Sequence, residues 1–139
     1  MKTQLVLIAL VSLLGCGCAE TKPTTQSSPS EINLPLGESR TLDGHSITFL
    51  KLLEDSRCPK DVQCIWAGRA ILQFEVKEAG GASETKKIYV GATRQGEPTS
   101  LEVFSNENLS WKVEAVLPSK AQGVEISNYS VVLIKTPKD

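Results

Sequence analysis

Residues 69–77 read Arg-Ala-Ile-Leu-Gln-Phe-Glu-Val-Lys and hold the clearest structural pattern in the chain. Apolar side chains stand at every second position from Ala70 to Val76, and the positions between them are mostly polar. A period of two is typical of a β-strand that packs one face on a core and turns the other to water. The stretch therefore predicts a half-buried strand.

Further segments are alternating or apolar runs bounded by turn residues. They predict strands over 32–36, 39–42, 46–54, 84–90, 100–104, 110–117 and 127–135. Pro35 marks the first of these as an edge strand, and Asp43-Gly44 is a strong hairpin signal before a central strand at 46–54. No helical period is sustained anywhere. The sequence predicts an all-β fold, either an antiparallel β-sandwich or a small barrel of about seven or eight strands.

The N-terminus has the layout of a secretory signal. Lys2 supplies a positive charge, an apolar run of about ten residues follows from Leu5, and the small residue Gly15 precedes Cys16. Leu13-Leu14-Gly15-Cys16 resembles the lipobox of bacterial lipoproteins, in which the cysteine is acylated and becomes the new N-terminus. The resemblance implies lipidation at Cys16. Cys18 is a weaker candidate, and an ordinary signal peptide remains the alternative.

Residues 16–30 contain almost nothing that could enter a core and are rich in Ser, Thr and Pro. Such a segment cannot offset the entropy lost on ordering, so we expect a lipidated N-terminus and flexible tether there. The expected organisation is a signal peptide over 1–15, this tether, and a single β domain over 31–139. The lipobox resemblance implies a membrane anchor in the cell envelope. Because Gly17 rather than Asp follows the cysteine, it implies the outer membrane, facing the periplasm, if the organism has two membranes.

Charge and length exclude some classes of function. The 139-residue chain has a formal net charge of −1, which becomes −2 when Lys2 leaves with the signal peptide. There is no basic field that would attract nucleic acid. No second apolar segment approaches the length needed to cross a bilayer. About 109 residues beyond the tether suffice for one small domain and not for two.

The four cysteines sort by position. Cys58 and Cys64 lie within the predicted domain, in a compartment that permits disulfides, and we expect them to pair. Their bridge would close a seven-residue loop and stabilise the fold by roughly 2–3 kcal/mol. Cys18 is left over in the tether, where it is free, capped, or paired with another chain.

Residues 55–68 stand apart from the strand patterns and read Asp-Ser-Arg-Cys-Pro-Lys-Asp-Val-Gln-Cys-Ile-Trp-Ala-Gly. The segment resembles a motif of small, uncharacterised bacterial lipoproteins: Asp-Ser-Arg-Cys-Pro, a few residues, then Cys, an aliphatic residue, Trp, one residue and Gly. The resemblance implies a lipid-anchored all-β domain. It carries no assigned activity and no catalytic residues.

The chemistry of this segment suggests how it is built. Asp55 and Ser56 are turn formers, and Arg57 has Asp55, Asp61 and Glu54 as possible partners. We expect Trp66 to pack over the disulfide and the neighbouring sheet, burying about 200 Å2. Gly68 predicts a positive φ or a close backbone approach where the chain re-enters the sheet.

The leading functional hypothesis is a non-enzymatic binding or accessory module of the envelope. A disulfide-closed loop would present a preorganised surface to a protein, a peptide or an envelope polymer. The candidate binding residues are Asp55, Arg57, Lys60, Asp61 and Trp66. A purely structural role, in which the loop is only a covalent staple, is the competing interpretation.

Three other functions are open. A peptidase inhibitor would offer Arg57 or Lys60 to a trypsin-like pocket. A metal site would use Cys58, Cys64 and the single histidine, His45, but the Cys-x5-Cys spacing is unusual for zinc and His45 is expected to be a solvated turn residue. An envelope hydrolase would need paired acids that meet only in the fold, since no nucleophile elbow, phosphate loop or His-Glu-x-x-His motif is present. The chain is therefore expected to have no catalytic residue, metal or cofactor.

Overall fold

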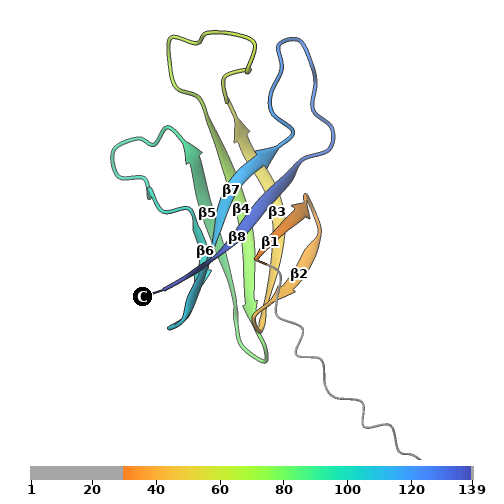
Figure 1. Ribbon diagram of the computed structural model, residues 1–139, viewed down its shortest axis with the longest axis vertical. Helices are drawn as coiled ribbons and strands as arrows, with labels where there is room; N and C mark the ends of the chain where they lie inside the picture. Colours follow the sequence, from red (N-terminus) through yellow and green to blue (C-terminus); the bar gives the residue numbers. More distant parts are fainter. Residues whose placement is uncertain (1–29, 139) are drawn as a thin grey trace, which may run out of the picture.

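The computed structural model describes residues 30–138, which form two antiparallel sheets of four strands each, packed face to face as a sandwich (Figure 1). The prediction of an all-β sandwich is confirmed. The expected signal peptide, the lipidation at Cys16 and nearly all of the expected tether, Cys18 included, lie outside the described residues. The strands are β1 (Glu31–Pro35), β2 (Ser39–Leu42), β3 (His45–Asp55), β4 (Arg69–Glu78), β5 (Ser83–Gly91), β6 (Glu102–Ser105), β7 (Leu109–Leu117) and β8 (Ser130–Pro137).

The strand order is β1-β8-β7-β6 in one sheet and β2-β3-β4-β5 in the other. β1 is an edge strand, as Pro35 predicted, and β3 is an inner strand, as its apolar sequence predicted. The strand predicted over 39–42 is present as β2, and it belongs to the opposite sheet from β1. The chain changes sheet through a turn in which Gly37 N–H donates to the Phe49 carbonyl at 2.7 Å.

The inner faces of both sheets supply the core. The alternation seen at 69–77 is confirmed, and Phe49 of β3 stacks on Phe74 of β4 with ring centroids 5.3 Å apart. The buried apolar side chains come from all eight strands: Leu34, Leu42, Ile47, Phe49, Ala70, Leu72, Phe74, Val76, Ile88, Val103, Phe104, Trp111, Val113, Val116, Val131 and Leu133.

A polar contact at the edge of this core ties the two sheets together. The turn between β2 and β3 is the predicted Asp43-Gly44 hairpin, with Asp43 at φ 46° and Gly44 at φ 84°. The Asp43 carboxylate accepts a hydrogen bond from Trp111 Nε1 at 2.7 Å and forms an ion pair with Lys135 Nζ at 2.8 Å. Both donors lie in the other sheet, so Asp43 links the hairpin to β7 and β8.

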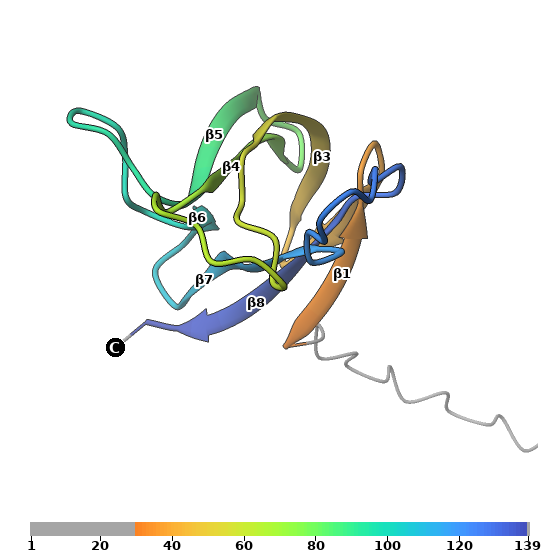
Figure 2. The same ribbon diagram turned by 90° about the horizontal axis from the view of Figure 1, so that it is seen from above.

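Three long connections emerge at the same end of the sandwich, at the top of Figure 1. They are 56–68 between β3 and β4, 92–101 between β5 and β6, and 118–129 between β7 and β8. Seen from above, 56–68 lies between the other two (Figure 2). We call this region the loop end. The connection 118–129 is longer than predicted, because β8 begins at Ser130 and not at residue 127.

Candidate functional site

The base of the loop end is an ion pair between Asp55, the last residue of β3, and Arg57. Arg57 donates to the carboxylate from Nε at 2.8 Å, from Nη2 at 2.9 Å and from its backbone N–H at 3.2 Å. Tyr129 O–H donates to the same carboxylate at 2.9 Å. Burial opposes ionisation, but these donors lower the pKa of Asp55 to about 2. The Asp55 carboxylate is therefore a fixed anion at neutral pH.

Arg57 also reaches across to the opposite sheet. Its Nη1 donates to the Val116 carbonyl at 2.6 Å and its Nη2 to the Pro118 carbonyl at 3.2 Å. The hydrogen bonds to the Asp55 carboxylate raise the pKa of Arg57, so the guanidinium stays charged. Its side chain is only 17% exposed, and that of Asp55 is 8% exposed. Arg57 thus closes the end of the sandwich, and the expectation that the loop displays it is wrong.

Connections 56–68 and 118–129 are joined along their length. Lys120 Nζ donates to the Asp55 carbonyl at 2.9 Å, and the Lys60 N–H donates to the Lys120 carbonyl at 3.1 Å. Further out, the Gln122 N–H donates to the Asp61 carboxylate at 3.2 Å. These contacts run from the sheet toward the tip, so the two connections form one body.

The disulfide between Cys58 and Cys64 is present, as predicted, with their Cα atoms 6.0 Å apart. Inside the closed loop, the Val62 N–H donates to the Pro59 carbonyl at 3.1 Å. Gly68 ends the connection where its backbone passes the backbone of Ser56, and a Cβ at this position would overlap the Ser56 carbonyl oxygen. The predicted close approach at Gly68 is confirmed.

A second arginine fixes the other side of the base. Arg69, the first residue of β4, donates to Glu54 from Nε and Nη2 at 3.0 Å each, and to Glu97 from Nη1 at 2.7 Å. Its guanidinium carbon lies 5.9 Å from the Tyr89 ring centroid. The Arg69 hydrogen bond lowers the pKa of Glu54, and the Arg94 backbone N–H and Arg69 lower that of Glu97. Glu97 belongs to 92–101, so Arg69 attaches the third connection to the sheet.

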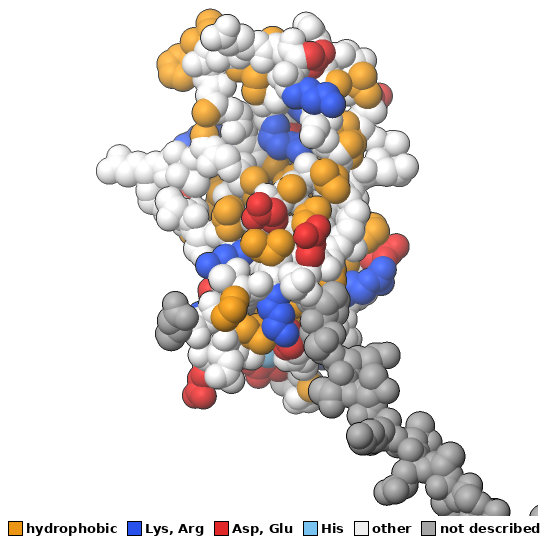
Figure 3. All heavy atoms as spheres, in the orientation of Figure 1, with side chains coloured by type: hydrophobic (Ala, Val, Ile, Leu, Met, Phe, Trp, Pro, Cys, Tyr) orange, Lys and Arg blue, Asp and Glu red, His pale blue; other side chains and the backbone are white. Residues whose placement is uncertain are grey.

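The tip of the connection 56–68 is formed by residues 62–66, which we call the apex, and its apolar side chains are exposed to water. Ile65 is 93% exposed and Trp66 is 83% exposed, with Val62 partly exposed beside them. Apolar side chains accordingly gather at the upper edge of the molecule, over the connection between β3 and β4 (Figure 3). The expectation that Trp66 packs over the disulfide and the sheet is wrong. The end of the sandwich is instead closed by Arg57 and Tyr129, which both donate to Asp55.

The five candidate binding residues thus divide into two sets. Asp55 and Arg57 are inside the base, whereas Lys60, Asp61 and Trp66 lie on the surface. Sequence reasoning missed the residues that complete the base, which lie far away in the chain: Arg69, Glu97, Lys120 and Tyr129. Their sequence context carries no signal of this role, because each meets its partner only after both sheets have formed.

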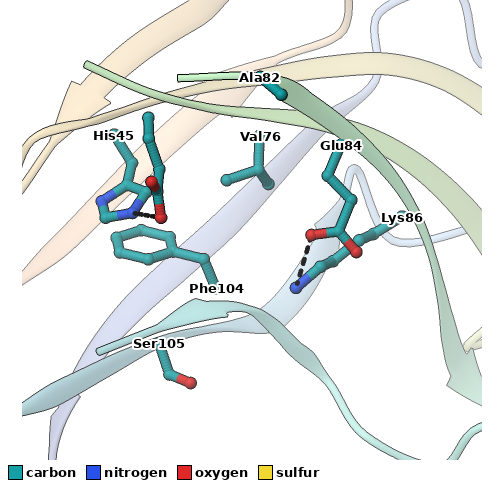
Figure 4. Close-up of a pocket in the computed structure, with 8 residues that line it drawn as sticks. His45, Val76, Ala82, Glu84, Lys86, Phe104 and Ser105 are labelled. Carbon is teal, nitrogen blue, oxygen red and sulfur yellow. Dashed lines mark ion pairs between the residues drawn. The ribbon is translucent and has the colours of Figure 1, made fainter. Parts of the chain in front are cut away.

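The expected position of His45 is also wrong. His45 opens β3, its ring stacks on Phe104 with centroids 4.2 Å apart, and its Nε2 lies 3.5 Å from the Glu78 carboxylate. A cavity of about 190 Å3 adjoins it, with Val76 at its back and the Glu84–Lys86 ion pair at its other side (Figure 4). His45 is therefore a largely buried strand residue and not a solvated turn residue. The cavity lies at the end of the sandwich opposite to the loop end.

The metal alternative loses its ligands, since Cys58 and Cys64 are bonded to each other. Across residues 30–138, no group of three or more His, Cys, Asp or Glu side chains is arranged to hold a metal ion. Within the same residues, no helix has the length and apolar character needed to cross a membrane. No family model, curated protein or solved structure matches the chain.

Proposed function

We propose that the chain is a lipid-anchored, extracytoplasmic binding module of the bacterial cell envelope, without enzymatic activity, and that it binds through the loop end. The signal sequence and the lipobox-like Leu13-Leu14-Gly15-Cys16 support the location. The single observation that carries the binding role is the adjacent pair Ile65 and Trp66, exposed at the apex of the disulfide-closed connection.

A staple alone does not account for this apex. A disulfide that only stabilises the fold needs no large apolar side chains exposed to water, and neighbouring exposed apolar side chains are the kind of surface on which interaction sites are built. Tryptophan is also among the residues that contribute most to binding when they are buried by a partner. The exposure of Trp66 therefore favours recognition over a purely structural role.

The base of the loop end supports the same interpretation. Asp55, Arg57 and the disulfide hold the apex before any partner arrives. Because the connection is already ordered, less conformational entropy is lost when it binds. Arg57 cannot serve the peptidase-inhibitor alternative, because its guanidinium donates to Asp55 and Val116 and does not extend toward the pocket of a protease.

Two carboxylates in the base of the loop end, Asp55 and Glu54, are poor acid/base catalysts. Asp55 accepts four hydrogen bonds and has a pKa of about 2, and Glu54 is bound by Arg69. A general acid or base at neutral pH needs a pKa near the working pH and a free hydrogen-bonding position. Both groups are instead held as structural anions, which favours a non-enzymatic role.

A photocrosslinking amino acid placed at the exposed position Gln63, in cells of the producing bacterium, tests this proposal. We expect adducts from Gln63 that disappear when Trp66→Ser is introduced in the same chain, because the apex then loses its main apolar contact. The matched control is the exposed Glu107, in the turn between β6 and β7 at the other end of the sandwich. Identical adducts from both positions, or Gln63 adducts that persist with Trp66→Ser, would contradict the proposal.

A further inference from the structure

The apex has three properties that together indicate what covers it. Residues 62–68, Val-Gln-Cys-Ile-Trp-Ala-Gly, carry no charge. Ile65 and Trp66 are the most exposed large apolar side chains of the described residues. The apex also projects from the molecule, and four cavities of about 190 to 400 Å3 are all lined by residues outside 56–68. A projecting apolar apex suits a deformable apolar phase better than a small ligand, which needs a concave site.

The chain outside the described residues has the length to bring this apex to a membrane. β1 begins beside Ser30, whose carbonyl accepts from the Lys135 N–H at 2.8 Å, and runs toward the loop end, where Pro35 pairs with Ser130. The fourteen residues from Cys16 to Pro29 reach at most about 50 Å when extended. Five or six residues of strand cover about 20 Å between Ser30 and the loop end, and half of the connection 56–68 adds at most about 25 Å to its apex. The reach of the chain from Cys16 exceeds this sum, so an anchor at Cys16 and the apex can contact the same bilayer.

We infer that Ile65 and Trp66 form a second membrane contact, inserting into the interfacial layer of the bilayer that holds the Cys16 anchor. This inference rests on the proposed function and names the partner of the loop end as a lipid surface. Tryptophan favours the membrane interface, where its ring sits at the level of the headgroups with its apolar part toward the acyl chains and its N–H on a polar partner. The apex then fixes the orientation of the domain on the membrane, which the tether alone leaves free.

The charges next to the apex indicate which lipids suit it. Lys60 and Asp61 precede it in the same connection and carry opposite charges, whereas Lys120 directs its ammonium to the Asp55 carbonyl at the base. The opposite charges balance, so the electrostatic attraction to anionic lipid is small. Insertion depends on the apolar side chains alone. We expect it on zwitterionic phosphatidylcholine, and we expect it to persist at high salt.

The experiment uses the mature lipidated chain, reconstituted through its own anchor into phosphatidylcholine vesicles with brominated acyl chains. Bromine quenches tryptophan fluorescence at contact, and the Trp66 signal is the difference between the wild-type chain and Trp66→Phe. Trp111 is fully buried and supplies the constant background. We expect most of the Trp66 emission to be quenched by the brominated lipid and the remaining emission to be protected from aqueous acrylamide.

Two substitutions of the same chemical kind sharpen the test. Ile65→Ser removes an apolar side chain from the apex and is expected to lower the inserted-to-free ratio by about tenfold. Leu53→Ser removes a 45% exposed leucine from the face of β3 and is expected to leave the quenching unchanged.

Trp66 that stays open to acrylamide and unquenched by bromine in these vesicles would overturn the membrane contact. Native envelope fractions then separate the two proposals. Protection of Trp66 by envelope fractions but not by pure lipid would leave the binding role intact with a protein or polymer as partner. No protection in either would overturn both.

Discussion

At the end of β3, Asp55 accepts hydrogen bonds from the Arg57 guanidinium and from the Tyr129 hydroxyl, and so connects the start of 56–68 to the end of 118–129, which is distant in the chain. Its pKa, which is about 2 in the fold against an ordinary 3.8, makes this contact measurable. Since the unfolded chain takes up the Asp55 proton first as the pH falls, the folded state loses stability below pH 4 and the loss is complete below about pH 2.

Asp55→Asn is therefore expected to remove a pH-dependent contribution to the unfolding free energy. The difference between the wild-type chain and this variant should shrink by about 2 kcal/mol between pH 5 and pH 2. Urea unfolding followed by circular dichroism at several pH values measures it. Glu114→Gln, at an exposed position on β7, is the control. Parallel pH curves for the wild-type chain and Asp55→Asn would show that the Asp55 ion pair is unimportant for stability.

Asp43 joins the two sheets at the edge of the core, by accepting from donors of β7 and β8. Asp43→Ala leaves the Trp111 N–H without its acceptor and removes the partner of Lys135, so we expect a loss of about 2–3 kcal/mol in unfolding free energy. Asp43→Asn keeps an acceptor and tolerates the left-handed φ of 46°, and it should cost less than half as much. Equal losses for the two variants, measured by thermal unfolding, would contradict the role of the Trp111 hydrogen bond.

The strands could be predicted from the sequence because their patterns are local. The alternation from Ala70 to Val76 follows from the geometry of one strand, and the hairpin at Asp43-Gly44 from a two-residue signal. The start of β8 was misplaced since residues 127–129 look like strand but belong to the connection that Tyr129 ties to Asp55. The side of the loop to which Trp66 turns depends on what fills the end of the sandwich, and no local pattern encodes that.

The disulfide is expected to stabilise the folded state without determining the structure of the sheets. Replacing both Cys58 and Cys64 by Ser should lower the unfolding free energy by about 2 kcal/mol, because a seven-residue loop gains freedom in the unfolded chain. The far-ultraviolet circular dichroism of the folded protein should not change. Reduction of the wild-type chain should produce the same shift in the urea midpoint. A variant that no longer folds would mean that the sandwich depends on this bridge.

A substitution at Gly68 tests the close backbone approach between the end of the connection 56–68 and Ser56. Gly68→Ala places a methyl group on the Ser56 backbone carbonyl, and neither strand end can move without breaking contacts at the base. We expect a loss of about 3 kcal/mol. Gly81→Ala, where the nearest atom is a Glu78 side-chain carbon at 3.1 Å, is the comparison and should cost much less. Similar melting temperatures for the two variants would argue against the close approach at Gly68.

At the scale of the whole molecule, the two ends of the sandwich differ. One end has short turns, and the other holds the three long connections with an ordered polar base and an apolar apex. The sequence pointed to 55–68 as the distinctive segment and to its disulfide. It assigned the roles within the segment wrongly for Arg57 and Trp66, because a charged residue is usually exposed and a tryptophan usually buried. Here the Arg57 guanidinium donates to Asp55 and to the Val116 carbonyl of the other sheet, and the Trp66 side chain lies outside the core.

The two tryptophans give the most direct test of the claim that this molecule binds through its loop end. Trp66 is 83% exposed and Trp111 is completely buried, so chain labelled with fluorotryptophan contains one reporter at the apex and one reference in the core. Fluorine NMR is recorded with the lipidated chain in native envelope membranes and in a mild detergent. The account predicts that the membranes shift or broaden the Trp66 resonance and leave that of Trp111 in place. A Trp66 resonance that keeps the position of a solvated indole in the native membranes would contradict it.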